Sequence, residues 1–154
     1  CGFLSGTMRK ELKFVPLCVD RMLALVPPKL LPSGCKTLPL EAISDIDFII
    51  PGEGSNYDIG RILRTAGVRP RVKYSVSDDY AAVAMAEGGL GMTIVPELIL
   101  KGIGGNRAAV ELEPACTRTI GIAERSIGTG SPACAAFMRF TENWVKRHSE
   151  DAIQ

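Results

Sequence analysis

Residues 46–67 read IDFIIPGEGSNYDIGRILRTAG, and this stretch decides the fold. The apolar run Ile46–Ile50, closed by a Pro-Gly pair, is typical of a buried strand. A Ser55 and Asp58 pair then fits the N-cap and third residue of a helix that Gly67 ends. The stretch predicts a strand, a glycine turn and a helix, whose buried face holds Ile59, Ile62, Leu63 and Ala66.

The same alternation continues downstream. Residues 72–76 alternate as a second strand, Ser77 or Asp78 can cap a second helix, and Leu90–Val95 is typical of a third strand. Pro96 stands where a further helix can begin. Strands and helices at this spacing predict right-handed crossovers in a mostly parallel sheet, so we expect an α/β lobe.

Extended segments flank this lobe. Residues 14–26 are long and apolar, and residues 117–125 alternate. Two such segments on either side of an α/β lobe predict strands that cross between half-domains through a hinge. The expected division is a partial first lobe with a crossing strand at 1–25, a second lobe at 26–116, and the return strand with a last helix at 117–154.

The composition limits the classes of function. Among 154 residues, 18 Lys and Arg face 17 Asp and Glu, which disfavours a nucleic-acid surface because phosphate binding needs clustered basic residues. Five scattered cysteines and the single His148 form no zinc-type ligand set. No apolar stretch has the length of a membrane span. We expect a cytoplasmic protein with free thiols and without a metal or cofactor.

The glycine turn after the first predicted strand is the candidate binding site. Parallel sheets bind ligands at the carboxyl ends of their strands, through free backbone N–H groups. Gly52 and Gly54 permit close approach of the backbone, and Ser55 and Asn56 can donate hydrogen bonds to a carboxylate. Acidic residues in the same stretch disfavour phosphate. A plain glycine turn before a capped helix explains these residues equally well, so both interpretations stay open.

Several short motifs resemble, in order, the effector-binding domain of LysR-type transcriptional regulators. They are FVPLCVD with MLALVPP (residues 14–28), LPL leading into FIIP (38–51), EGGLGMTIVP (87–96), RTIGIA (118–123), and Pro132 with Phe137. The resemblance spans nearly the whole chain. It implies a periplasmic-binding-protein-like (type 2) α/β fold of two lobes, one complete and the other partial, with a small-molecule effector between them.

The resemblance also implies partners and site residues. The family's N-terminal winged helix-turn-helix has no counterpart, so we expect a fragment that contacts DNA only through an absent domain, as part of a homo-oligomer. The effector, a small carboxylate or aromatic acid, would contact Ser5, Gly54, Ser55 and Asn56. The family's Ser/Thr anchor at the start of the first lobe is missing, and so is the cysteine of its peroxide-sensing members.

The last helix carries an aromatic stripe of Phe137, Phe140 and Trp144. We interpret this stripe as core, and the resemblance implies that it packs on the sheet of the first lobe. Because much of that sheet has no counterpart in this chain, we also expect the stripe to lose part of its burial.

Two other classes of protein share this architecture. A solute-binding module for transport would carry an export signal and a complete first lobe. An enzyme such as a deaminase or dehydratase would need a convergent acid–base or nucleophile set. Paired acids such as Asp78 and Asp79 fall at element ends, where capping explains them, so we predict no catalytic residues and no enzyme.

Overall fold

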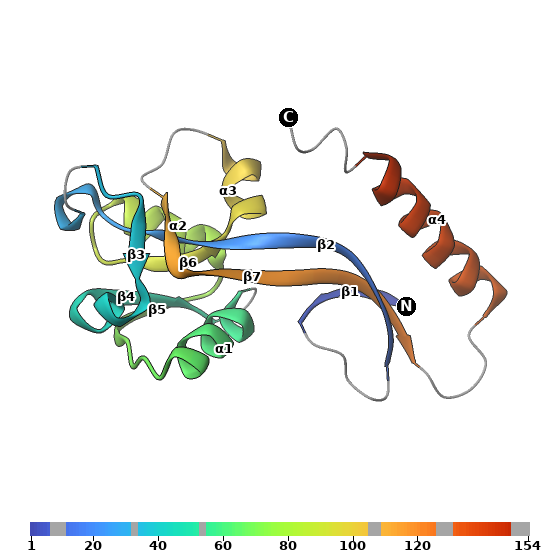
Figure 1. Ribbon diagram of the computed structural model, residues 1–154, viewed down its shortest axis with the longest axis horizontal. Coiled ribbons are helices and arrows are strands. Elements are labelled where there is room, and N and C mark those ends of the chain that lie inside the picture. Colours follow the sequence, from blue (N-terminus) through green and yellow to red (C-terminus); the bar gives the residue numbers. More distant parts are fainter. Residues whose placement is uncertain (7–11, 32–33, 53–54, 105–108, 126–130, 149–154) are drawn as a thin grey trace. The chain divides into compact units, whose positions relative to one another are not determined.

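The computed structural model describes residues 1–6, 12–31, 34–52, 55–104, 109–125 and 131–148 (Figure 1). The chain forms two compact units, the first made of Cys1–Asp20 with Arg118–Gln154 and the second of Arg21–Thr117. It therefore passes between the units twice, between residues 20 and 21 and between residues 117 and 118. Both passages lie inside long strands, β2 (Leu12–Leu25) and β7 (Ala109–Arg125).

The second unit alternates strands and helices as predicted. Its elements are β4 (Asp47–Pro51), α1 (Asn56–Ala66), β5 (Arg71–Val76), α2 (Asp79–Glu87), β6 (Thr93–Pro96) and α3 (Glu97–Ile103). β4 pairs in parallel with β5, and Met92, just before β6, forms a parallel bridge with Phe48. The expected α/β fold with parallel strands is confirmed. The third strand is shorter than predicted, since Leu90 lies outside it and is exposed.

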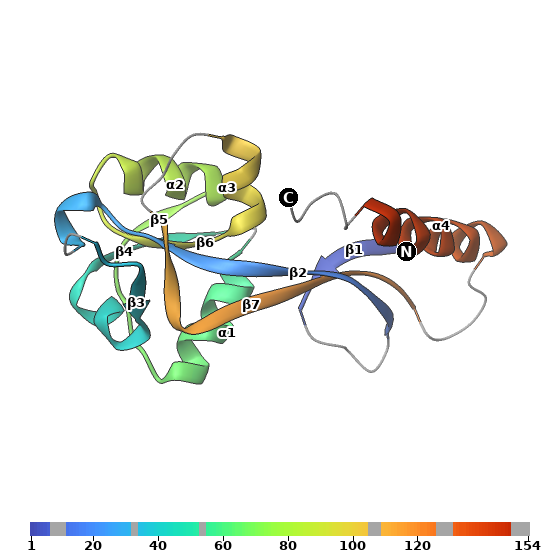
Figure 2. The ribbon, with the colours of Figure 1, turned by 45° about the horizontal axis from the view of Figure 1, so that its top comes forward.

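Consecutive strand residues point to opposite faces and divide the core between two clusters. Phe48 and Ile94 pack in one cluster, to which α1 contributes, whereas their neighbours Ile49 and Val95 pack in a second cluster with α2. α1 and α2 therefore cover opposite faces of the strands (Figure 2). Three of the four predicted core residues of α1 are buried, and Ala66 is exposed because it lines a cavity.

The two long strands are neighbours in one sheet, with the order β1-β7-β2-β6. β2 pairs antiparallel with β6, and β3 (Thr37–Pro39) pairs in parallel with β7. The 3₁₀ turns η1 (Pro28–Leu30) and η2 (Leu40–Asp45) flank β3. A Cβ at Gly121 would lie 2.5 Å from the carbonyl oxygen of Val15, so glycine lets the strands approach. The two segments that the sequence predicted to be extended thus lie in neighbouring strands.

The first unit contains the ends of the chain. β1 (Gly2–Ser5) pairs antiparallel with β7, and α4 (Pro132–His148) follows. The aromatic stripe is not core in this chain, because α4 buries Met138 and Thr141 instead, and the expectation that the stripe loses part of its burial is confirmed. The exposed fractions of the stripe residues are 48% for Phe137, 60% for Phe140 and 48% for Trp144.

Candidate functional site

The predicted binding turn connects β4 to α1 in the second unit. Gly52 donates its N–H to the carbonyl oxygen of Val76, the last residue of β5, over 2.7 Å. A Cβ at position 52 would lie 3.2 Å from that oxygen, so a larger residue would press against β5. The turn is thereby fixed to the neighbouring strand at its carboxyl end. Gly54 lies outside the described residues.

Ser55 stands at the N-cap of α1 but does not cap it. Its backbone is already helical, and its side chain makes no capping hydrogen bond. The predicted pairing with Asp58 is therefore wrong, because the Ser55 N–H donates instead to Asp79 Oδ2 of α2 over 3.2 Å. The Ser55 side chain is fully buried, and among the residues that the structure describes its Oγ has no hydrogen-bond partner. Such a buried hydroxyl is costly, so its retention calls for an explanation.

Two buried carboxylates lie at the start of α1. Asp58 is in its first turn, and Asp79 reaches it from α2. Arg61 follows one turn later, with Nη2 at 3.8 Å from Asp58 Oδ1, and donates to the carbonyl oxygen of Thr117 over 2.8 Å. The acids offset the positive end of the helix. The start of α1 thus combines backbone donors with carboxyl groups, which suits a ligand that both accepts and donates hydrogen bonds.

The two acids at the start of α2, Asp78 and Asp79, have different hydrogen-bond partners. Asp78 Oδ1 accepts the N–H of Ala81 over 2.9 Å, and this backbone hydrogen bond lowers the pKa of Asp78 below its ordinary value. The predicted capping role is confirmed for Asp78. It is wrong for Asp79, whose carboxylate bonds to Ser55. The sequence carries no signal for this contact, since the two residues belong to different helices 24 positions apart.

Two further predicted site residues, Asn56 and Ser5, belong to different units. Asn56, the first residue of α1, is half-buried, and its Nδ2 lies 3.5 Å from the Gly52 carbonyl oxygen. Ser5 ends β1 in the first unit, opposite Ile120 of β7, and is also half-buried. The structure therefore places Ser55 and Asn56 together at the helix start and Ser5 in its own unit.

A cavity of about 420 Å³ opens beside α1 within the second unit, which falls in the range of about 300–1,000 Å³ usual for small-molecule sites. α1, η2 and β7 supply its walls, with Ile62 on the apolar side and Arg61 and Thr117 on the polar side. Cys116 also lines it, and burial raises the pKa of this thiol. A raised pKa leaves the thiol protonated at neutral pH, so Cys116 is a poor nucleophile.

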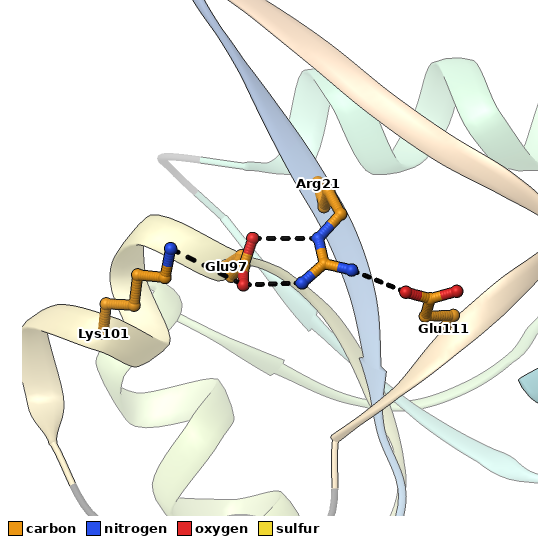
Figure 3. A network of polar contacts seen from close by, with 4 residues as sticks. All are labelled: Arg21, Glu97, Lys101 and Glu111. Atoms are coloured by element: carbon orange, nitrogen blue, oxygen red, sulfur yellow. Dashed lines mark hydrogen bonds and ion pairs between the residues drawn. The ribbon is translucent and has the colours of Figure 1, made fainter. Parts of the chain in front are cut away.

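A charged network lies where β2 enters the second unit (Figure 3). Arg21 Nε and Nη2 donate to the two carboxylate oxygens of Glu97 in α3, over 3.0 and 2.8 Å, and Nη1 donates to Glu111 of β7. Lys101 Nζ lies 3.7 Å from Glu97. The hydrogen bond from Arg21 lowers the pKa of Glu97 below its ordinary value. Sequence reasoning missed this network, because Glu97 and Glu111 lie 76 and 90 positions from Arg21.

A second ion pair lies on the other side of the same passage. In the first unit, Arg118 Nε and Nη2 both bond to Asp20 Oδ2, over 3.0 and 2.9 Å. Both side chains are largely buried. A buried pair needs such hydrogen bonds to offset the loss of hydration, and removal of either partner is strongly destabilising.

No group of three His, Cys, Asp or Glu side chains that could hold a metal ion occurs within the described ranges. None of the helices that the structure describes has the length and apolar character needed to cross a membrane.

Solved structures share this fold at low sequence identity. The effector-binding domain of QuiR in complex with shikimate superposes with a TM-score of 0.76 and 21% identity, over 95% of this chain and 72% of that chain. The CcmR regulatory domain of Synechocystis PCC6803 in complex with 2-PG gives 0.79 and 17%, over 94% and 72%. Full-length CbnR with its target DNA gives 0.71 and 19%, over 94% and 53%. Curated protein sequences gave no match.

The sequence profile of one family covers almost the whole chain. It is described as the LysR substrate binding domain and matches residues 3–146. That span contains the α/β unit, both long strands and most of α4. The match favours the regulator over the transport module and the enzyme. The chain therefore belongs to the LysR substrate-binding domain family, the effector-sensing part of LysR-type transcriptional regulators.

Proposed function

We propose that this domain binds a small organic acid and transmits the binding event to a DNA-bound homo-oligomer in the cytoplasm. The start of α1 carries this proposal. It lies at the carboxyl end of a parallel strand, where open α/β sheets bind their ligands, and it holds the buried Ser55 Oγ without a partner. A hydroxyl left unsatisfied in the protein alone is explained if a ligand supplies its hydrogen bond.

Ser55, Asn56 and Gly54 would contact the effector from the second unit, and Ser5 from the first. QuiR and CcmR are seen with shikimate and 2-PG, which supports an acid as the ligand class. The carboxyl groups of Asp58 and Asp79 at the helix start add a condition. Their oxygens can accept hydrogen bonds, so an acid that also carries hydroxyl groups can donate to them, whereas a plain carboxylate cannot.

Effector binding would act through a population shift. An effector that contacts both units favours the arrangement of the units in which both contacts form, by as much as its affinities for the two arrangements differ. DNA contacts would come from an N-terminal domain that is not in this chain. A coupling of about 1–3 kcal/mol between the two sites is typical of such systems.

Calorimetric titration tests the site. Shikimate and benzoate are titrated into the chain and into an N-terminally extended chain with a complete first lobe. We expect shikimate to bind more tightly, and Asn56→Ala to weaken it about tenfold, which is about 1.4 kcal/mol. Asn143→Ala, on exposed α4, is the matched control. Equal affinities for the two asparagine variants would remove Asn56 from the site, and no binding by the extended chain would contradict an acid as effector.

A further inference from the structure

The four residues that flank the two passages between the units each take part in a hydrogen bond with a charged group. Asp20 and Arg118 bond to each other in the first unit. On the second-unit side, Arg21 bonds to Glu97 and Glu111. Thr117 accepts from the guanidinium of Arg61 in α1 through its carbonyl oxygen. The chain connects the units nowhere else.

The hydrogen bonds of Asp20 and those of Arg21 lie on opposite faces of β2. Because successive side chains of a strand point to opposite faces, consecutive residues Asp20 and Arg21 leave β2 in opposite directions. One bonds to Arg118 of β7 and the other to Glu111 of the same strand. β2 and β7 are therefore linked by charged pairs on both faces at the level where they change units.

The exposure of these side chains indicates that the ion pairs fix the orientation of the strands more than they stabilise the fold. Arg21 is 53% exposed and Glu111 is 51% exposed, and ion pairs between such side chains contribute little to folding. A bidentate guanidinium–carboxylate contact nevertheless fixes direction, because its two parallel hydrogen bonds allow one planar geometry. Arg21 thus ties β2 to the start of α3 and to β7 in a defined orientation at little gain in stability.

We infer that Asp20, Arg21, Arg61 and Arg118 are positioning residues that fix how the two strands leave each unit, so that β2 and β7 move as one ribbon. That this ribbon carries the effector signal rests on the proposed function. These four residues and their hydrogen bonds, called the clamp below, do not depend on the proposed function, because the bonds form without an effector. Loss of one clamp residue is expected to widen the range of arrangements that the two units adopt.

Distance distributions between spin labels test the clamp without any effector. One label is attached at Ala84→Cys on α2 and the other at Arg139→Cys on α4, both exposed helical positions, in a chain whose five native cysteines are replaced by serine. We expect Arg21→Gln and Arg61→Gln to broaden the distribution about twofold, with melting temperatures close to the parent. Arg21→Lys should broaden it too, since Lys keeps the charge but lacks the planar fork.

Arg71→Gln is the matched control. Arg71 forms an ion pair with Asp47 at 2.7 Å in the same unit, remote in sequence from both passages, and its loss should leave the distribution unchanged. Distributions for Arg21→Gln and Arg61→Gln as narrow as that of Arg71→Gln would overturn the inference. The side chains of Arg21 and Arg61 are partly exposed, so these variants fold and decide the question even if changes at buried Asp20 unfold the chain. Either result leaves the effector titration unaffected.

Discussion

Ser55 carries a group that is unfavourable for folding, and the proposed effector site would explain its retention. Its hydroxyl is buried without a hydrogen bond, while its backbone N–H is used by Asp79. Natural cores rarely keep such a group unless it has a task. At this position the unsatisfied oxygen lies at the start of α1, where the effector is proposed to bind.

Ser55→Ala should therefore raise stability and weaken binding together. Removing an unsatisfied buried hydroxyl is expected to increase the free energy of unfolding by about 1 kcal/mol, measured by urea denaturation. Ser75→Ala, at an exposed hydroxyl on β5, should change it by less than about 0.5 kcal/mol. A more stable Ser55→Ala variant that binds shikimate as tightly as the parent would exclude Ser55 from the effector site.

At the scale of elements, a close contact between β4 and the start of β6 depends on glycine. Gly91 precedes the bridge residue Met92, and a Cβ at position 91 would lie 2.5 Å from the carbonyl oxygen of Asp47. The backbone of β4 cannot give way without loss of the two hydrogen bonds that join Met92 to Asp47 and Ile49. Gly91 is thus explained by close packing.

Gly91→Ala should destabilise the chain by about 1–3 kcal/mol, as overpacking against a fixed backbone does. Gly102→Ala is the contrasting substitution, because a Cβ at Gly102 in α3 meets nothing within 4 Å. Because Gly102 stands one residue before the end of α3, alanine there should be stabilising by no more than about 0.5 kcal/mol. Chemical denaturation measures both. A Gly91→Ala variant as stable as the parent would show that β4 shifts without cost.

The Arg21–Glu97 contact between β2 and α3 gives stability a pH dependence. The folded pKa of Glu97 lies below its ordinary value of 4.5, so its contribution is present above that pH and is lost as the pH falls through the folded pKa. Because a partly exposed ion pair contributes little, Glu97→Gln should lower the free energy of unfolding at neutral pH by less than about 1 kcal/mol, and this small difference from the parent should shrink below about pH 4.5. A difference that stays constant down to about pH 3 would contradict the assignment to this carboxylate.

Patterns within a few residues predicted the helices and strands well, whereas contacts between residues distant in sequence were not predicted. The strand–turn–helix pattern around α1 and the glycine stop at Gly67, with φ of +69°, follow from spacing and backbone preference, which act within a few residues. The bond from Ser55 to Asp79 and the network of Arg21 depend on which elements meet in space. For the candidate site, the turn between β4 and α1 was predictable from the strand end, whereas the approach of Asp79 from α2 was not.

At the scale of the whole molecule, α4 buries little of its aromatic side. Trp144 stacks on His148 of the same helix, with ring centroids 4.2 Å apart, and is half exposed. Buried Met138 holds the other side of the helix. The stability that α4 gains from packing therefore comes from fewer residues than its aromatic content suggests.

Trp144→Ala should cost less than about 2 kcal/mol, well below the 3–5 kcal/mol or so of a fully buried aromatic. Met138→Ala, 6% exposed, should cost more, about 2–5 kcal/mol, although methionine is the smaller side chain. Both values come from urea denaturation of the chain. A loss of 3 kcal/mol or more for Trp144→Ala would show that the aromatic stripe is covered by partners in solution.

The order in which the two passages occur along the chain also has a consequence for biosynthesis. Every residue of the second unit is made before Arg118, and at that point the first unit still lacks the end of β7 and all of α4. Domains generally fold as they are completed, N-terminal parts first. Residues 21–117 can therefore reach their native state early, whereas residues 1–20 must wait for residues 118–148 to be made.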